Sequence, residues 1–440
     1  MPRSRPALLS TMLGAGARPP LTIARGRGMQ LTLGDGRTVL DAGSLSSCIV
    51  GHCAPEVVAA VRAAADVAYV GDTVGYAARE QVAQDLLRIG FAGEPWADTV
   101  AFFVSSSEAA DMGLLLAQQL TGRDAIVCRT NSYHGGVGLA REASTHPLWD
   151  AALSSPEGGV TPRSPALATI RRLPVPDCWA GDGGDGHDCA ASCLHDAPAA
   201  LRDAAAAIMD VTQGGACPPP QYVDRLAAMA RDAGALWLAD ETVSAFGRLG
   251  HGFAFQRGAR RPDMVQLGKG LTGGAAPGGA LVLSREVVER IGERRWMTAS
   301  TFRGHPLTVA AISAVLGIVE RDGLVEHAAG VGPAFGRDLR EIAARHPSAE
   351  RVIGEGLLWI VKLTAPPAFA EGTWHGDGRR TPPSELVQQA ALDAGVFVGA
   401  YSGEAVWLVP PLIATAEQLA QAAQALDAAL TVADRHLEAA

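Results

Sequence analysis

From about residue 100 onward, the chain alternates short apolar runs with polar or glycine-rich residues and longer helix-like segments. This pattern is typical of a mostly parallel sheet with helices on its faces. In such sheets the carboxyl ends of the strands form the ligand crevice, so polar residues that follow the strands are expected to meet in one site. Five runs end in this way, at residues 100–104, 125–128, 207–209, 236–239 and 264–267.

The two ends of the chain have a different pattern. Residues 30–33 and 38–40 alternate apolar and polar positions around an Asp-Gly turn, which predicts a hairpin. After about residue 320, helical segments rich in alanine and leucine alternate with short strands at 358–361 and 406–409. This second pattern predicts a compact α+β end domain.

We therefore expect an α/β protein with two domains, which also suits a length of 440 residues. Residues 61–320 would form the large domain and 321–440 the smaller α+β domain, which the N-terminal segment 1–60 would join. Within the large domain, residues 154–196 are rich in Gly, Pro, Asp and Ser, so they predict a long loop or insertion.

Composition and charge narrow the class of partner. Hydrophobic residues make up 48% of the chain and charged ones 19%, and no run of 18 apolar residues could span a bilayer. We therefore expect a soluble protein of the cytoplasm with no membrane partner. A formal net charge of −9 argues against nucleic-acid binding, which depends on basic patches. Small molecules are the expected partners.

The cysteines predict neither a disulfide framework nor a metal site. There are seven, an odd number spread through a long chain, so reduced thiols are expected. His187, Cys189, Cys193 and His195 lie close together in the sequence, but their spacing matches no common zinc pattern. We expect no metal there.

Lys269 stands between Gly268 and Gly270, directly after a run predicted to be a buried strand. A desolvated lysine can lose its proton and form an imine with an aldehyde cofactor, which is the task of the lysine in pyridoxal enzymes. A surface turn is the structural alternative. A phosphate-binding loop is excluded because residues 262–268 lack its glycine spacing.

Asp240 ends another predicted strand, 29 residues before Lys269 (269 minus 240). A carboxylate at that place can keep a pyridine nitrogen protonated, so that the ring accepts the electrons released when a substrate C–H bond breaks. An acidic residue that merely caps a strand end is the alternative. Together, Asp240 and Lys269 on adjacent strand ends form the pair that pyridoxal phosphate requires.

Other motifs are consistent with the same cofactor but are less specific. Ser105, Ser106 and Ser107 precede a helical segment, where backbone N–H groups could bind phosphate or a serine could simply cap the helix. Tyr133 and His134 precede two glycines and could place an aromatic face near a ring, although single aromatics in loops usually only pack. The segment around Thr301 and Gly304-His305-Pro306 could be a simple turn.

These clusters resemble motifs of the class III pyridoxal-phosphate aminotransferases, and they occur in the same order along the chain. The family includes ω-amino acid transaminases and glutamate-semialdehyde aminomutase. The resemblance covers nearly the whole chain. It rests on seven ordered motifs: Gly51-His52 with Pro55-Glu56, 105–109, Tyr133-His134-Gly135, Asp240-Glu241 through Phe246-Gly247-Arg248, Pro262-Asp263 through Gly268-Lys269-Gly270, Thr301-Phe302 with Gly304-His305-Pro306, and Pro410-Pro411-Leu412.

The resemblance implies fold type I, with a mostly parallel seven-stranded sheet in the large domain and pyridoxal 5'-phosphate as the cofactor. Lys269 would carry it as a Schiff base, Asp240 would meet the pyridine nitrogen and Tyr133 would stack on the ring. Ser106 and Ser107 would bind the phosphate. Thr301 would reach the phosphate of the neighbouring subunit's cofactor, which implies a homodimer with its sites at the interface.

Several positions depart from the family pattern. Many relatives have Gly in place of Ser106, Glu-Pro in place of Asp210-Val211, and Val in place of Thr242, so the surroundings of the ring are altered. His134 and Asp210 are still expected near the cofactor, as is Gln213, which matches a glutamine near the ring hydroxyl or the substrate.

Trp407 stands where many members have an arginine that grips a substrate α-carboxylate. Since an indole cannot replace the bidentate fork of arginine, we infer that the substrate lacks an α-carboxylate at that point or that another residue such as Arg303 holds it. An arginine placed elsewhere in the loop is the alternative.

The expected activity is amino transfer between a small-molecule donor and an aldehyde or ketone acceptor, in two half-reactions. A peptide end or another natural-product intermediate fits such a site, as in secondary metabolism. An aminomutase, racemase or decarboxylase of the same fold is the alternative, because all need the same lysine and aspartate. A non-catalytic scaffold would be expected to have lost Lys269 or Asp240, and both are present.

Overall fold

The structure is a computed structural model. It describes residues 21–44, 46–67, 71, 73–145, 167–176, 193–210, 218–364 and 382–438. In this part of the chain no helix is long and apolar enough to cross a membrane.

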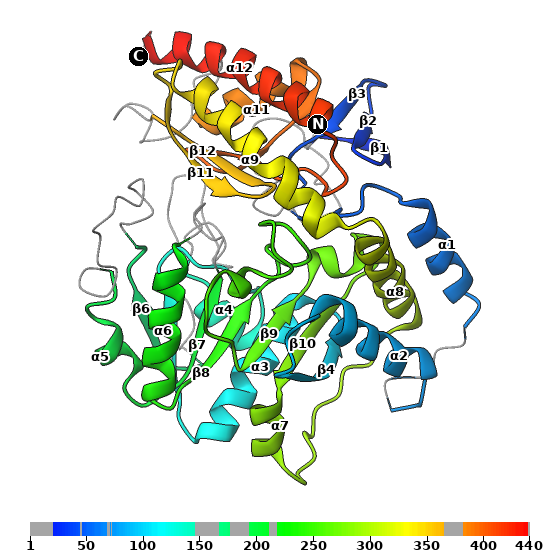
Figure 1. The fold of residues 1–440 in the computed structure, drawn as a ribbon, viewed down its shortest axis with the longest axis vertical. Helices are drawn as coiled ribbons and strands as arrows, with labels where there is room; N and C mark the ends of the chain where they lie inside the picture. The colour runs from blue at the N-terminus through cyan, green and yellow to red at the C-terminus, as the bar shows by residue number, and fades with distance from the viewer. Residues whose placement is uncertain are drawn as a thin grey trace, which may run out of the picture.

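The large domain is built on a seven-stranded sheet in which only β10 runs against the other six strands (Figure 1). This confirms the predicted mostly parallel sheet of an α/β fold. The five predicted apolar runs lie in its strands, except for Val104, which follows the end of β4. In sheet order the strands are β4 (Ala97–Phe103), β10 (Gly279–Ser284), β9 (Met264–Leu267), β8 (Leu236–Asp240), β7 (Ala204–Asp210), β5 (Ala125–Arg129) and β6 (Ile170–Leu173).

Helices cover both faces of this sheet, so its strands are apolar on both sides. In β8, Leu236 and Leu238 pack in the cluster that contains α3, whereas Trp237 and Ala239 pack in the larger cluster that contains α6. The helical elements up to α8 are α1 (Pro55–Ala64), α2 (Ala77–Asp85), η2 (Leu86–Gly90), α3 (Ser106–Thr121), α4 (Gly138–Ala143), α5 (Ala197–Leu201), α6 (Pro220–Asp232), η5 (Ala254–Arg257), η6 (Lys269–Thr272), α7 (Arg285–Ile291) and α8 (Pro306–Arg321).

The two ends of the chain form two smaller sheets above the large domain in Figure 1. The predicted N-terminal hairpin is present as β2 and β3, and β13 from the C-terminal part adds to it in parallel. One sheet contains β1 (Ile23–Arg27), β2 (Gln30–Leu33), β3 (Thr38–Asp41) and β13 (Val396–Phe397); the other contains β11 (Ala349–Glu355), β12 (Leu358–Leu363), β15 (Ala405–Leu408) and β14 (Gly399–Ser402). The accompanying helices are α9 (Leu324–Ala343), α11 (Pro383–Asp393) and α12 (Ala416–Glu438).

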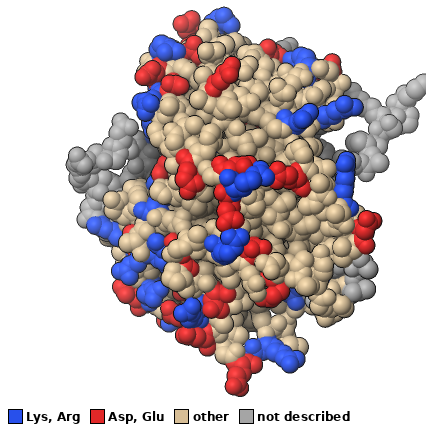
Figure 2. All heavy atoms as spheres, turned by 45° about the vertical axis from the view of Figure 1, so that its right-hand side comes forward, with Lys and Arg blue, Asp and Glu red and all other residues tan. Residues whose placement is uncertain are grey.

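Acidic and basic side chains are intermixed on the face shown in Figure 2. Two exposed ion pairs connect α8 to neighbouring helices: Arg321 meets Glu56 of α1 at 2.6 Å, and Arg88 of η2 meets Glu320 at 2.7 Å. Exposed pairs of this kind contribute little to stability, because solvent screens them. The association of these helices therefore depends on their apolar contacts.

A partly buried ion pair anchors the loop that follows β3. The His52 Nε2 atom lies 2.7 Å from Oδ2 of the fully buried Asp41, whose Oδ1 accepts a hydrogen bond from the Gly43 amide. The hydrogen bond with Asp41 and a second with Cys48 raise the pKa of His52 from 6.5 to about 10. The loop packs against the segment after β9, since a Cβ atom at Gly270 would lie 2.9 Å from Ile49 Cγ2.

We expect this pair to make stability depend on pH. Because the folded-state pKa of His52 is raised to about 10, its contribution to folding should be complete below pH 6.5 and be lost as the pH rises toward 10. His52→Gln should have a lower thermal midpoint at pH 6.5, by roughly 2–4 °C for each kcal/mol lost, with a smaller difference near pH 10. His195→Gln, at a mostly exposed position, is the control. A constant difference from pH 6.5 to 10 would contradict the assignment.

Candidate active site

Three polar side chains form a row at the carboxyl ends of adjacent strands. Asp210 of β7 pairs in register with Asp240 of β8, and Asp240 pairs with Gln266 of β9. Lys269 follows β9 by two residues. The row therefore brings the predicted Asp240 and Lys269 to neighbouring strand ends, as their positions in the sequence led us to expect.

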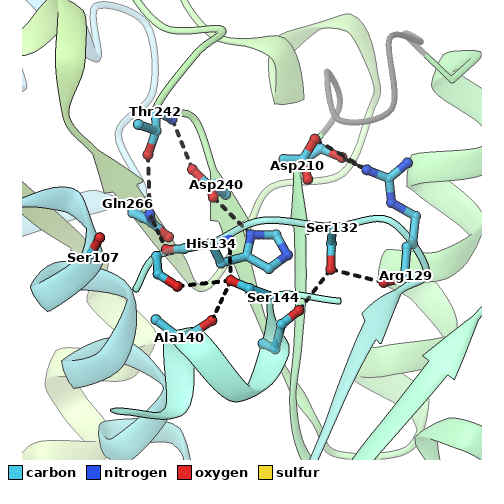
Figure 3. A network of polar contacts seen from close by, with 12 residues as sticks. Ser107, Arg129, Ser132, His134, Ala140, Ser144, Asp210, Asp240, Thr242 and Gln266 are labelled. Carbon is cyan, nitrogen blue, oxygen red and sulfur yellow. Dashed lines mark hydrogen bonds and ion pairs between the residues drawn. The ribbon is translucent and has the colours of Figure 1, made fainter. Parts of the chain in front are cut away.

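Both oxygens of the Asp240 carboxylate are oriented by hydrogen bonds (Figure 3). Oδ2 lies 2.8 Å from His134 Nδ1, and Oδ1 accepts a hydrogen bond of 3.0 Å from the Thr242 amide. Asp240 and His134 are buried. A carboxylate held from two sides cannot turn away from a ligand at the strand end.

A second group of contacts fixes His134 and Thr242. The His134 amide donates to Ser144 Oγ at 2.9 Å, and Ser144 Oγ in turn donates to the backbone oxygens of Gly135 and Ala140. Gln266 Nε2 donates to Thr242 Oγ1 at 3.1 Å. No pattern in the sequence pointed to Ser144, whereas a glutamine inside a buried strand was a usable signal for Gln266.

Lys269 occupies an unusual backbone position. It begins the short helix η6 with a φ of 39°, a conformation that non-glycine residues rarely adopt. Burial lowers the pKa of its amine, while the nearby carboxylates of Asp240 and Asp210 act in the opposite direction. The amine is thus close enough to both aspartates to feel their charge, and its proton is easier to remove than that of an exposed lysine.

The start of α3 lies beside Lys269. Ser105 is the N-cap, and its Oγ accepts a hydrogen bond from the Glu108 amide at 3.2 Å, so the capping interpretation holds for this serine. Ser106 and Ser107 are the first residues of the helix, where backbone N–H groups have no partner within the helix. A Cβ atom at Gly268 would lie 2.6 Å from Ser106 Cβ, so the helix start and the lysine segment are in close contact.

Gly135 allows the segment that follows β5 to pack closely against the first turn of α3. A Cβ atom at this glycine would lie 2.7 Å from Ser107 Cα, which excludes any side chain there, and its φ is 143°. Tyr133, two residues earlier, is half-buried, and burial together with Asp240 raises the pKa of its hydroxyl. The structure therefore brings the Tyr133 segment, the serines, Asp240 and Lys269 together.

Asp210 is held by a buried arginine that the sequence reading missed. Arg129, the last residue of β5, lies 3.2 Å from Asp210 Oδ1 and also donates to the Asp210 backbone oxygen (Figure 3). Ser132 holds the backbone around Arg129 in place, because its Oγ donates to the backbone oxygens of Arg129 and Ala143. An arginine that closes an otherwise apolar strand was the available signal.

The remaining predicted residues lie farther along the chain. Thr301 is exposed in the turn before α8, and Arg303 in the same turn donates from Nη2 to the Thr298 oxygen at 2.7 Å. Trp407 is buried in β15, three residues before Pro410. Gln213 and most of the predicted 154–196 loop lie outside the described residues, as do His187 and Cys189 of the cysteine cluster.

The loop that follows Asp240 connects the polar strand ends of Asp210, Asp240 and Gln266 to the smaller domain. The pKa of Glu241 is raised to about 7 by burial, and its carboxylate accepts hydrogen bonds from Ser244 and from the Ala254 and Phe255 amides. Arg248, fully buried, donates to the backbone oxygens of Leu357 and Pro410. Burial lowers the pKa of Arg248 to about 9.

Comparison with known proteins identifies one family over nearly the whole chain. The family model for class-III aminotransferases matches residues 13–430. An acetylornithine aminotransferase of Mycobacterium tuberculosis is 30% identical over 426 residues, which are 96% of this chain and 94% of that protein. A diaminobutyrate–2-oxoglutarate aminotransferase of Rhizobium meliloti is 28% identical over 440 residues, covering 94% of this chain and 88% of that one.

Solved structures with the same architecture are also similar in sequence. The crystal structure of an S-selective transaminase from Arthrobacter sp. with alanine bound superposes with a TM-score of 0.87 at 26% identity, covering 99% of this chain and 97% of that one. An amine transaminase from an uncultivated Pseudomonas species, in its PLP-bound form, gives a TM-score of 0.84 at 27% identity, covering 97% and 99%.

Proposed function

The chain belongs to the class III aminotransferases, which depend on pyridoxal 5'-phosphate, and from that premise we propose that it moves an amino group between a donor amine and an aldehyde or ketone at Lys269 and Asp240. The observation that carries this proposal is the position of Lys269 and Asp240 at the ends of neighbouring strands, with the amine within electrostatic reach of the carboxylate.

The residues present fit the cofactor. The backbone N–H groups of Ser106 and Ser107 at the start of α3 suit a phosphate, because a helix N-terminus favours anions. Gly135 and Gly268 let the neighbouring backbones approach these serines where a Cβ atom would clash. Asp240 suits a protonated ring nitrogen and Tyr133 the flat face of the ring. When bound, pyridoxal phosphate supplies an aldehyde that condenses with amines and a ring that accepts electrons.

Within this arrangement each side chain has a distinct task. We propose that the Lys269 amine carries the cofactor, then receives the proton that leaves the substrate carbon and returns it. Because burial lowers its pKa, the amine gives up its proton more readily than an exposed lysine does. Asp240 keeps the ring nitrogen protonated, and His134 holds Asp240 in position. Asp210, Thr242 and Gln213 are proposed to lie around the ring.

A homodimer is part of the proposal. Thr301 is exposed at the start of the turn before α8, next to Phe302, whose exposed fraction is 58%, while that of Met297 is 89%. Large apolar side chains exposed together suit a protein interface. We propose that this turn packs against a second copy, so that Thr301 reaches the phosphate bound by the partner subunit. The free thiols of Cys48, Cys53 and Cys128 suit the reducing cytoplasm proposed as its location.

The substrate is proposed to lack an α-carboxylate bound in the usual way. Trp407 occupies the position of the carboxylate-gripping arginine, and its buried indole offers no fork of donors. An amine, an aldehyde or ketone on a larger molecule, or the modified end of a peptide or other secondary metabolite satisfies this condition. Arg303 is the alternative carboxylate ligand in this proposal.

A panel of amino donors tests this proposal. We expect the holoenzyme to convert simple alkylamines with a lower KM than alanine, the ligand bound in the Arthrobacter transaminase structure. Trp407→Arg should lower the KM for alanine by roughly 10- to 100-fold, since a hydrogen-bonded charge pair contributes about 1.5–3 kcal/mol. The measurement is the change in cofactor absorbance in the first half-reaction. Equal KM values for alanine and alkylamines in the unmodified enzyme would contradict the role given to Trp407.

The same assay separates amino transfer from its alternatives. An aminomutase or racemase needs no co-substrate, and a decarboxylase releases CO₂ without an acceptor. We expect turnover of the donor to stop after one equivalent per site until a keto acid or aldehyde is added. Continued turnover without an acceptor would favour one of these alternatives.

A further inference from the structure

The turn before α8, residues 301–304, is held by a side chain from a distant part of the chain. Arg79 of α2 donates a hydrogen bond of 2.7 Å from Nε to the backbone oxygen of Gly304, 225 positions later. A Cβ atom at Gly304 would lie 3.0 Å from both Cδ and Nε of Arg79, and the φ of this glycine is 59°. The close approach and the backbone angle therefore both favour glycine at this position.

The same guanidinium holds the segment that precedes α2. Its Nη1 atom donates to the Val74 oxygen at 2.8 Å, and Nη2 donates to the Gly71 oxygen at 3.3 Å. The Cζ atom of Arg79 lies 5.8 Å from the centre of the Tyr76 ring. Arginine has donors on three nitrogens of one rigid plane, so a lysine could not reproduce this arrangement.

Arg79 thus connects two segments that are far apart in the sequence. Helix α2 also packs against α8, and the two helices lie side by side in Figure 1. Hydrogen bonds within the turn region, such as the one from the Arg303 amide to the Ser300 oxygen at 3.1 Å, join near neighbours only. The bonds of Arg79, in contrast, fix the turn relative to α2.

Both segments expose a large apolar side chain. The exposed fraction is 44% for Val74 and 58% for Phe302. The backbone oxygens of Val74 and Gly304 bind one guanidinium, so the two segments are neighbouring parts of the surface. Exposed apolar side chains that lie close together suit a protein interface, and a second copy of the chain is the partner already proposed for this turn.

We propose that Arg79 is a positioning residue that acts across the dimer interface: by fixing the turn of Thr301, it shapes the site in which the partner subunit binds the cofactor phosphate. This inference rests on the proposed function, in which Thr301 reaches that phosphate, and it adds a residue that lies outside the seven sequence motifs. Each active site then depends on Lys269 and Asp240 of one chain and on Arg79 of the other.

Cofactor binding by the homodimer is the first test. Arg79→Met should weaken the binding of pyridoxal phosphate by roughly 10-fold or more, about the effect of one lost hydrogen bond of a charged group. Equilibrium dialysis measures the dissociation constant. At saturating cofactor kcat should change little, because the turn is proposed to contact the phosphate and not the reacting atoms. Arg62→Met is the matched control, since it removes one positive charge from an exposed position of α1.

Mixed dimers, purified through two different tags, show on which site the arginine acts. In a dimer of one Arg79→Met chain and one Lys269→Ala chain, the working lysine lies in the Arg79→Met chain, and the turn from the other chain is intact. We expect this site to bind the cofactor as tightly as the unmodified enzyme does, measured as activity against cofactor concentration. A chain with both substitutions, paired with an unmodified chain, should instead show the weakened affinity.

The proposal is overturned if Arg79→Met binds the cofactor as tightly as the unmodified enzyme, or if the first mixed dimer keeps the weak affinity and the second does not. Arg79→Lys keeps the charge without the fork of donors, and it replaces Arg79→Met in every pairing if that chain does not fold by thermal melting. A monomeric protein, or a Thr301→Ala variant with normal cofactor affinity, would show that the dimer in the proposed function is wrong, and the role of Arg79 would fall with it.

Discussion

Replacement of Lys269 by alanine should reduce amino transfer by roughly 10⁴-fold, the upper range for loss of a group that acts as acid and base. The fold should survive, because alanine removes only the side chain and leaves the backbone of the short helix η6 in place. Single-turnover conversion of the cofactor by an alkylamine, followed by absorbance, measures the effect.

A chemical control distinguishes this role from a structural one. Added methylamine should restore part of the activity of Lys269→Ala, since a small amine can accept and return the proton in place of the missing side chain. A variant that keeps more than a tenth of the original rate, or one that no amine rescues although it binds the cofactor, would contradict the assignment.

Replacement of Asp240 by asparagine should reduce the rate by roughly 10²- to 10⁴-fold. An amide is uncharged and cannot keep the ring nitrogen protonated, although it can still contact His134 and the Thr242 amide. The loss should therefore appear mainly in kcat and be accompanied by a change in the cofactor's absorption spectrum, which a purely structural defect would not cause.

His134→Gln is the companion variant, because it removes the hydrogen bond of 2.8 Å to Asp240 but leaves the carboxylate in place. It should reduce the rate less than Asp240→Asn does. An Asp240→Asn enzyme within tenfold of the original rate would show that this carboxylate does not meet the ring.

The hydrophobic pattern of the sequence was sufficient to predict which strands end in the candidate catalytic residues. Asp240 and Lys269 each follow an apolar run, and parallel strands place such residues at one edge. Strand β7 is longer than predicted: it begins at Ala204, because alanines do not signal a strand. The apolar run of β10 was not among the five predicted strands; because β10 runs antiparallel to its neighbours, the polar residues that follow it lie at the opposite edge of the sheet from the site.

Contacts between distant strands could not be predicted in this way. The pair of Arg129 and Asp210 depends on β5 lying beside β7, an order that no local pattern determines. The link from His134 to Asp240 likewise joins residues 106 positions apart. At the start of α3, the sequence left capping and phosphate binding open. The structure assigns the cap to Ser105 and places Ser106 and Ser107 in the first turn, where N–H groups have no partner within the helix.

The central claim is that the amine of Lys269 carries the cofactor. The most direct measurement is borohydride reduction of the holoenzyme, followed by digestion and mass mapping of the phosphopyridoxyl group. Since the chain has only two lysines, at positions 269 and 362, the outcome is unambiguous. We predict one label per chain, on the peptide that contains Lys269. A label on Lys362, or a chain that binds the cofactor and retains no label after reduction, would contradict the claim.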